Sequence, residues 1–230
     1  MISSASYSRL LDFESCKFKA FLKHYKRIPD PRPSPAADRG TAVHQACEDW
    51  MRDLPHQQKQ PAEAAKHFRA ELDSLKESFI QGKASLEGEW AFNRDWKPTE
   101  WKTGWFRLKA DAVVHPSPTE AVVIDYKTGK RFGNELKHGE QLQLYALAVF
   151  LREPEVKHVV AELWYFDQDD LARLDISRKE GLRYLRLFDN RARKMTEATT
   201  FPANPNMWSC KYCAYKSIEL GGTGHCSVGV

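Results

Sequence analysis

Hydrophobic residues recur at helical spacing through the first third of the chain. Between residues 6 and 26 the apolar positions follow steps of three and four, which predicts an amphipathic helix. Four prolines between residues 29 and 35 remove amide donors and predict an extended connector. A second helix is predicted from about Asp38 and a third after Pro61, and the helical part is expected to end near Gly82.

After Gly82 the pattern changes to an alternation of period two, which is typical of half-buried strands. The tail from Phe201 onward is rich in Pro, Gly and Cys and shows no periodicity. The order of elements predicts an α/β fold with a central mixed sheet flanked by helices. The predicted strands cover residues 86–92, 105–114, 121–127, 159–166 and 171–176, the first three as a meander, and the predicted helices cover 139–153 and 178–194.

Composition adds broad limits on the class of protein. The chain has 230 residues, which suits one domain, and its 42% hydrophobic and 29% charged residues are typical of a soluble globular protein. The net charge of +4 permits a polyanionic partner but is too small to establish one. No apolar run approaches the roughly 20 residues of a membrane span, and no signal peptide is recognisable. We therefore expect a cytoplasmic protein without a membrane partner.

The segment Val-Val-Ile-Asp-Tyr-Lys-Thr-Gly at residues 122–129 contains the most informative polar positions. An apolar strand there delivers Asp125 and Lys127 two residues apart, and period-two geometry places both on one face. Asp111 lies among apolar residues of the preceding predicted strand, so the two carboxylates can converge. The alternative is a surface ion pair with an unrelated aspartate at a strand end.

Two convergent carboxylates beside a lysine suit the hydrolysis of a phosphodiester bond. Carboxylate oxygens are the ligands that Mg²⁺ or Mn²⁺ prefers, and such a cation polarises a phosphate. Asp111 and Asp125 are the candidate ligands. Lys127 is expected to orient the attacking water or to offset negative charge in the transition state.

Four short motifs follow one another along the chain. They are Gly40 to His44 (Gly-x-x-x-His), Asp111, Asp125-Tyr126-Lys127, and Gln141 to Tyr145 (Gln-x-x-x-Tyr). Their order resembles the RecB-like branch of the PD-(D/E)XK nuclease superfamily, which combines a helical Gly-x-x-x-His, an Asp in one strand, Asp-x-Lys in the next strand and Gln-x-x-x-Tyr on the following helix.

This resemblance implies a restriction-endonuclease-like core and further site residues. It implies that His44 is a metal ligand, that the backbone carbonyl of Tyr126 completes the metal shell, and that Gln141 and Tyr145 hold the nucleic acid or water. The same helical side chains could instead serve only packing. An acid in the first strand is also expected at the site; Glu89 is the candidate, and its neighbour Glu87 could equally be meant.

The five cysteines are an odd number, which argues against a disulfide framework. Four thiolates suit Zn²⁺ or an iron–sulfur cluster, and the fifth, Cys47, lies on an apolar helical stripe and is expected to be buried. The candidate ligands are Cys16, Cys210, Cys213 and Cys226, with His225 as a substitute.

Cluster-bearing members of the same branch resemble this chain in having one cysteine in the first helix and three after the last. They include the CRISPR adaptation nucleases, the AddB nuclease and DNA exonuclease five. The resemblance implies a 4Fe-4S cluster, and Zn²⁺ or unligated thiols remain the alternatives.

Together these observations predict a single nuclease domain over residues 1–230. It is expected to consist of a helical part (1–82), a catalytic sheet with helices (83–195) and a cysteine-rich tail (196–230) that pairs with Cys16. The expected activity is metal-dependent exonuclease cleavage of DNA, on single strands or duplex ends. A structure-selective endonuclease and a non-catalytic DNA-binding module with a structural metal are the alternatives.

Overall fold

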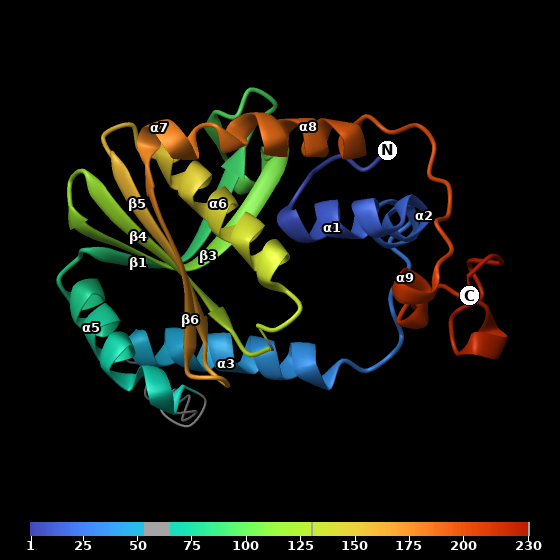
Figure 1. Ribbon diagram of the computed structural model, residues 1–230, viewed down its shortest axis with the longest axis horizontal. Coiled ribbons are helices and arrows are strands. Elements are labelled where there is room, and N and C mark those ends of the chain that lie inside the picture. The colour runs from blue at the N-terminus through green and yellow to red at the C-terminus, as the bar shows by residue number, and fades with distance from the viewer. Residues whose placement is uncertain (53–64, 130, 230) are drawn as a thin grey trace.

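A six-stranded mixed sheet stands between two layers of helices in the computed structural model, which describes residues 1–52, 65–129 and 131–229 (Figure 1). This confirms the predicted fold class. The strands are β1 (Ala84–Phe92), β2 (Pro98–Thr99), β3 (Phe106–Ser117), β4 (Glu120–Lys127), β5 (His158–Tyr165) and β6 (Asp170–Ser177), in the order β2-β1-β3-β4-β5-β6.

The pairing of the strands follows from their connections. β1, β3 and β4 are antiparallel neighbours, which confirms the predicted meander. β4 and β5 are parallel because α6 (Glu135–Arg152) crosses between them, as a parallel connection requires. β2, with two residues, is too short for a periodic pattern and was not predicted.

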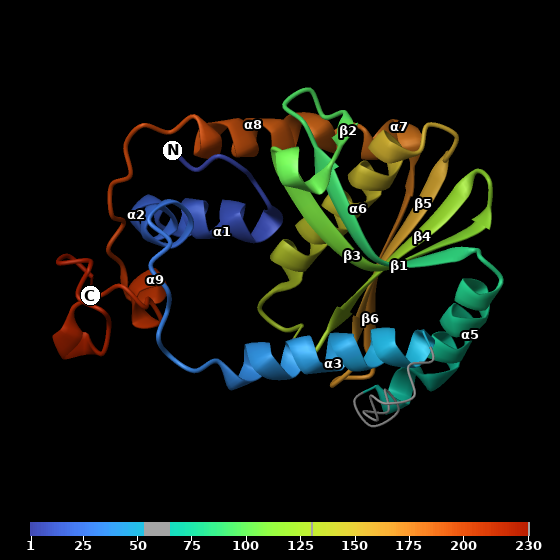
Figure 2. The same cartoon turned by 180° about the vertical axis from the view of Figure 1, so that it is seen from behind.

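The helices cover both faces of the sheet (Figure 2). Val123 of β4 packs in the core beneath α1, α6 and α8, whereas Ile124 and Tyr126 pack in the core beneath α3 and α5. The helical elements are α1 (Tyr7–Ser15), α2 (Lys17–Ala20), η1 (Phe21–Tyr25), α3 (Pro35–Met51), η2 (Lys66–Phe68), α5 (Arg69–Ile80), η3 (Trp101–Thr103), α6 (Glu135–Arg152), α7 (Arg178–Gly181), α8 (Tyr184–Thr196), α9 (Met207–Lys211) and η4 (Ile218–Leu220). Among the described residues, no helix is both long and apolar enough to span a membrane.

β3 and β4 separate at one end of their ladder, and this separation positions the site. Their regular pairing includes Ala112 opposite Ile124 but does not continue to Asp111. From there β3 continues beside β1, and β4 continues beside β5. The N–H of Tyr126 donates instead to the Oδ2 atom of Asp111, at 2.5 Å. The Asp111 carboxylate thus takes the place of the β3 backbone carbonyl that would accept this hydrogen bond in a regular sheet.

Two predicted helices are divided. The helix expected over residues 6–26 is interrupted at Cys16, whose extended backbone separates α1 from α2, and a π-helical turn follows. The helix expected over 178–194 is divided into α7 and α8. Apolar spacing continues across both breaks, so periodicity does not detect the change of backbone direction. The predicted helix start after Pro61 lies outside the described residues.

The C-terminal tail packs against the N-terminal helices rather than against the sheet. Leu22, Ala214, Tyr215 and Cys226 form a small separate core. The hydroxyl of Tyr215 donates to the carbonyl oxygen of Ile28 at 2.7 Å. Both views show α9 beside α2 (Figures 1 and 2). Chain segments about 190 residues apart thereby meet.

Asp12 stabilises the interrupted N-terminal helices. Its carboxylate contacts Lys19 and Lys23 at 2.8 Å each and His24 at 2.9 Å, and its side chain is 12% exposed. Burial alone would raise the pKa of Asp12, but the hydrogen bonds from His24 and the two lysines outweigh it and hold the pKa well below its usual range.

Asp12→Asn is therefore expected to lower the free energy of unfolding by about 2 kcal/mol at pH 7, as for hydrogen bonds to a charged group. Because the folded-state pKa is depressed, the carboxylate stabilises the fold fully above the unfolded pKa of about 4, and this contribution is lost as pH falls. The difference between variant and wild type should shrink below that pH in urea titrations. Asp73→Asn, which removes an exposed ion pair with Arg69, is the control; an equal loss there would contradict this role of Asp12.

Candidate active site and metal centre

α3 approaches the end of β4 closely because residue 40 is glycine. A Cβ atom at Gly40 would lie 3.2 Å from the Oγ1 atom of Thr128, a tight contact. Arg39 supports the same approach by pairing with Asp167 at 2.6 Å. One helical turn after Gly40, His44 reaches the sheet where β3 and β4 separate.

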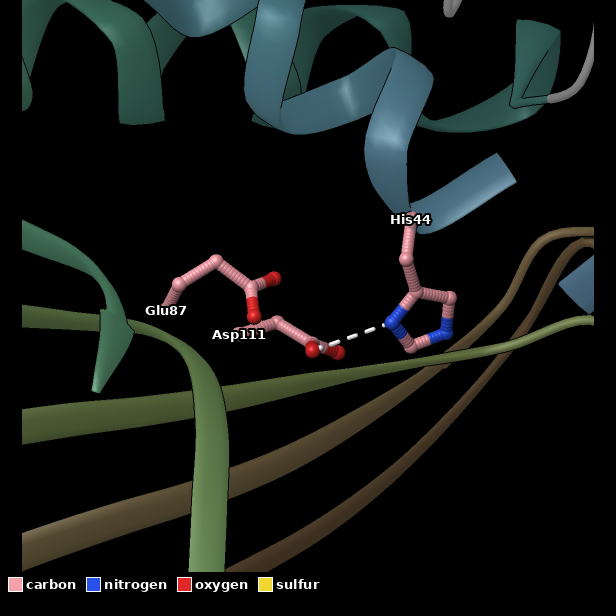
Figure 3. A group of neighbouring side chains, drawn as sticks. All are labelled: His44, Glu87 and Asp111. Atoms are coloured by element: carbon pink, nitrogen blue, oxygen red, sulfur yellow. Dashed lines mark hydrogen bonds and ion pairs between the residues drawn. The ribbon is translucent and has the colours of Figure 1, made fainter. Parts of the chain in front are cut away.

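His44, Glu87 and Asp111 form a candidate metal site (Figure 3). One ligand atom from each residue lies within 4.8 Å of those of the other two. The Nδ1 atom of His44 is 3.0 Å from the Oδ1 atom of Asp111. The carboxylate of Glu87 points toward that of Asp111 (Figure 3). Three elements, α3, β1 and β3, therefore deliver metal-binding atoms to one point.

The backbone of Glu87 is unusual. In the register of β1 with β3 this residue lies between the pairs Leu86↔Ala112 and Gly88↔Ala110, opposite Asp111, and is left out of the regular ladder. Its φ angle of 50° is in the left-handed region, which is uncommon for a residue other than glycine. Such strain is concentrated at functional sites, so we infer that it serves to aim this carboxylate.

The charges of this group favour a cation. Burial, together with the charge of Asp125, raises the pKa of Asp111, although His44 and the Tyr126 amide oppose the shift. Burial and the charge of Asp111 likewise raise the pKa of Glu87. Burial lowers the pKa of His44, but its hydrogen bond to Asp111 and the charges of Asp111 and Asp125 together outweigh this, so the net shift is upward. One imidazole nitrogen and two carboxylate groups form a donor set that can hold a divalent metal ion, and the carboxylate oxygens are ligands that suit Mg²⁺ or Mn²⁺.

Asp125 lies beside this group with its carboxylate held from two sides. The Tyr145 hydroxyl donates to Oδ1, and Lys127 forms an ion pair with Oδ2. Gln141 donates to the Tyr145 hydroxyl at 2.9 Å. Oδ2 is buried and, despite the ion pair, makes no hydrogen bond of normal geometry within the described part of the chain. This oxygen, contacted only by the Lys127 ammonium group among the described residues, is the position of the carboxylate that a metal ion could share.

The structure brings together most of the residues predicted for the site. His44, Asp111, Asp125 and Lys127 converge where the strands separate. The Tyr126 backbone belongs to the same opening: its N–H contacts Asp111, and in a strand the N–H and C=O of one residue project to the same side.

Glu89 is placed apart from the group. Its carboxylate forms an ion pair with Lys109 at 2.8 Å across β1 and β3, and its side chain is 46% exposed. Glu87 takes the position for which Glu89 was the candidate. The sequence shows two acids at alternate positions of one strand, but not the left-handed backbone that separates them.

The structure places Tyr145 and Gln141, which were expected to hold the nucleic acid or water, at the Asp125 carboxylate. The Tyr145 side chain is buried, with 3% exposure, and its hydroxyl faces Asp125. Gln141 in turn contacts that hydroxyl. This arrangement supports a positioning role, in which both side chains orient the Asp125 carboxylate.

The cysteines form a second candidate site. Cys16, Cys210, Cys213 and Cys226 line one small cavity between α2 and the tail, and His225 is not among its lining residues. All are free thiols. Cys47 is fully buried, as expected, and packs in the same core cluster as Tyr126.

A model of the PD-(D/E)XK nuclease superfamily matches residues 4–218. No curated protein is significantly similar to the chain.

Three solved structures match most of the chain, and one of them has a TM-score above 0.5. A candidate exonuclease from Eubacterium rectale is 15% identical, with a TM-score of 0.54 over 90% of this chain and 86% of that protein. The protein SSO0001 is 16% identical, with a TM-score of 0.43 over 99% and 88% of the two chains. The alkaline exonuclease LHK-Exo from Laribacter hongkongensis is 12% identical, with a TM-score of 0.33 over 85% and 87%.

Proposed function

The chain belongs to the PD-(D/E)XK nuclease superfamily, and from this premise we propose that it is a Mg²⁺- or Mn²⁺-dependent DNA exonuclease. Membership makes it a hydrolytic nuclease of a group that uses divalent metals. The observation that carries the metal dependence is the convergence of His44, Glu87 and Asp111, with the charge of Asp125 acting on Asp111, at the opening between β3 and β4.

The proposed metal ligands are the side chains of His44, Glu87, Asp111 and Asp125 and the backbone carbonyl of Tyr126. A bound Mg²⁺ or Mn²⁺ would supply Lewis acidity that polarises the phosphodiester and balances its negative charge. The buried carboxylates of Asp111 and Asp125 repel one another without a cation, and the Oδ2 atom of Asp125, which makes no hydrogen bond among the described residues, supports its place in the set.

Lys127 is proposed to act on the reacting atoms directly. Its ammonium group is held at the Asp125 carboxylate, and its side chain is 21% exposed. From there it can hydrogen-bond to the attacking water or to a phosphate oxygen and offset charge in the transition state. Tyr145 and Gln141 keep Asp125 oriented for both its metal and its lysine.

Exposed apolar side chains in the segment that follows Lys127 support a single-stranded substrate. Phe132 lies in the segment between Lys127 and α6, and Leu136 lies in the first turn of α6. Both side chains are 87% exposed. Aromatic groups next to a nuclease site can stack on unpaired bases without regard to sequence.

The activity is tested by incubating the protein with end-labelled single-stranded DNA, end-labelled duplex and a closed circular single strand. We expect digestion of the labelled single strand with Mg²⁺ or Mn²⁺, none with EDTA, and an intact circle, because an exonuclease needs an end. Cleavage of the circle would favour the endonuclease alternative. DNA binding without any metal-dependent product would favour a non-catalytic binding module.

We further propose that the four cavity-lining cysteines hold a 4Fe-4S cluster. One cysteine from the N-terminal helices and three from the tail line a single cavity. Four thiolates around one point are a donor set for such a cluster, and Zn²⁺ is the alternative.

Cys16→Ser is expected to lose most of the iron, because it removes the one proposed ligand that the N-terminal helices supply. Iron content and visible absorption of anaerobically purified protein are the measurements. Cys47→Ala, which removes the buried thiol outside the cavity, should retain both. A colourless, iron-free, zinc-loaded wild-type protein would contradict the cluster.

A further inference from the structure

One face of α6 carries a third polar side chain toward the end of β4. His138 lies three residues before Gln141 and seven before Tyr145, so all three share a helix face. Gln141 donates a hydrogen bond to the Tyr145 hydroxyl, which in turn donates to Asp125. His138 belongs to the first turn of that face, where α6 begins beside the loop that follows Lys127.

The contact of His138 places it beside Lys127. Its Nδ1 atom is 2.5 Å from the hydroxyl of Tyr165. Tyr165 is the register partner of Lys127 in the parallel pairing of β4 with β5, and adjacent strands are about 4.8 Å apart. His138 therefore lies over the strand end that carries the lysine, on the face where Asp125 and Tyr145 meet.

The Tyr165 contact determines which nitrogen of His138 bears the proton. Burial raises the pKa of Tyr165 to about 12, so its hydroxyl remains protonated at neutral pH. Within the described part of the chain this hydroxyl has no second hydrogen-bond partner, and a buried O–H group needs an acceptor. The hydroxyl therefore donates to Nδ1, which leaves the proton of a neutral imidazole on Nε2.

The surroundings keep this imidazole neutral. Burial and the charge of Lys127 lower the pKa of His138, and Lys137 acts in the same direction, whereas Asp125 and Glu135 oppose it. The Nε2 atom has no partner among the described residues, and the His138 side chain is partly exposed. A hydrogen-bond donor without a partner thus stands beside the proposed reacting centre.

We propose that His138 is a substrate-binding residue of this nuclease, whose Nε2–H donates to a non-bridging phosphate oxygen of the DNA strand, and that Tyr165 is the positioning residue that selects this tautomer. The inference rests on the proposed function. It assigns to His138 a contact that holds the strand against Lys127, without any proton transfer in the chemical step.

The test compares His138→Leu with His138→Gln. Leucine removes the donor, whereas the glutamine amide can present an N–H near the position of Nε2. Hydrogen bonds to charged groups are worth about 1.5–3 kcal/mol, so we expect His138→Leu to weaken binding of fluorescein-labelled oligothymidylate in EDTA at least about 10-fold. The same variant should raise KM with little change in kcat, because the contact is made in substrate and transition state alike. His138→Gln should restore most of the affinity.

Tyr165→Phe removes the tautomer selection but keeps the ring, and its expected loss of affinity is smaller. His158→Leu is the matched control: His158 starts the same strand, pairs with Asp175, and lies at the end far from the site. It should bind DNA like the wild type. Thermal unfolding of each variant shows whether a loss of affinity reflects a loss of stability. If the Leu variant does not fold, the Gln and Phe variants still test the contact.

Two results would overturn the inference: wild-type DNA affinity in a folded His138→Leu protein, or an equal loss in the Gln and Leu variants. If the wild type cleaves DNA, either result would contradict only the proposed role of His138. If the wild type neither binds nor cleaves DNA, the proposed function itself would be contradicted.

Discussion

Lys127→Ala is expected to lower kcat/KM for DNA hydrolysis about 10³-fold, the upper range for removing one group that stabilises transition-state charge. The ammonium group sits on the Asp125 carboxylate at the opening between the strands, where it can reach both the water and the phosphate. The measurement is the initial rate of product formation from end-labelled single-stranded DNA at saturating Mg²⁺. Mn²⁺ binding should persist in the variant, because Lys127 is not a metal ligand.

Lys109→Ala is the matched control for this experiment. Lys109 lies on the neighbouring strand β3, two residues before Asp111, and pairs with Glu89 at the surface. An exposed ion pair contributes little, so the rate should stay within about 3-fold of wild type. Undiminished digestion by Lys127→Ala, or an equal loss in both variants, would remove Lys127 from its proposed role.

Glu87→Gln is expected to weaken Mn²⁺ binding at least about 100-fold and to abolish cleavage at low metal concentration. Loss of residues that merely support metal ligands already costs 10–100-fold, and Glu87 is proposed to be a ligand itself. Its carboxylate lies within 4.8 Å of the ligand atoms of His44 and Asp111. Isothermal titration with Mn²⁺ measures the affinity, and activity over a range of metal concentrations shows whether more metal restores cleavage.

Glu89→Gln changes the same kind of side chain two positions further along β1. Because Glu89 pairs with Lys109 and is half exposed, its removal should leave Mn²⁺ affinity unchanged. If Glu89→Gln instead loses the metal while Glu87→Gln retains it, the assignment of the two acids is reversed. The pair therefore tests the left-handed backbone at Glu87 as the feature that distinguishes them.

The sequence does not show that Glu87, rather than Glu89, lies at the proposed metal site. Alternation places Glu87 and Glu89 on one face of β1, so the pattern gives them equal standing. The distinction comes from a single φ angle of 50° and from the position of Asp111 on β3. Neither is a property of local composition.

The contact that Tyr145 makes could not be predicted from the sequence either. The spacing of Gln141 and Tyr145 correctly indicated one helix face that leads to the site. Whether that face meets the substrate or the Asp125 carboxylate depends on how deeply α6 packs on the sheet. Tyr145 is buried in the core, and its hydroxyl group contacts the Asp125 carboxylate.

The sequence by itself determined the strands and helices with strong periodicity, the fold class, and the placement of Asp125 and Lys127 on one strand face. These features follow from local backbone geometry, in which side-chain direction repeats with a period of 2 or 3.6 residues. Only the tertiary structure decided that β3 and β4 separate at Asp111, that His44 reaches that opening, and that Cys16 meets the tail. The physical reason is that such contacts join different elements of the fold, so their distances depend on how whole strands and helices pack rather than on neighbouring residues.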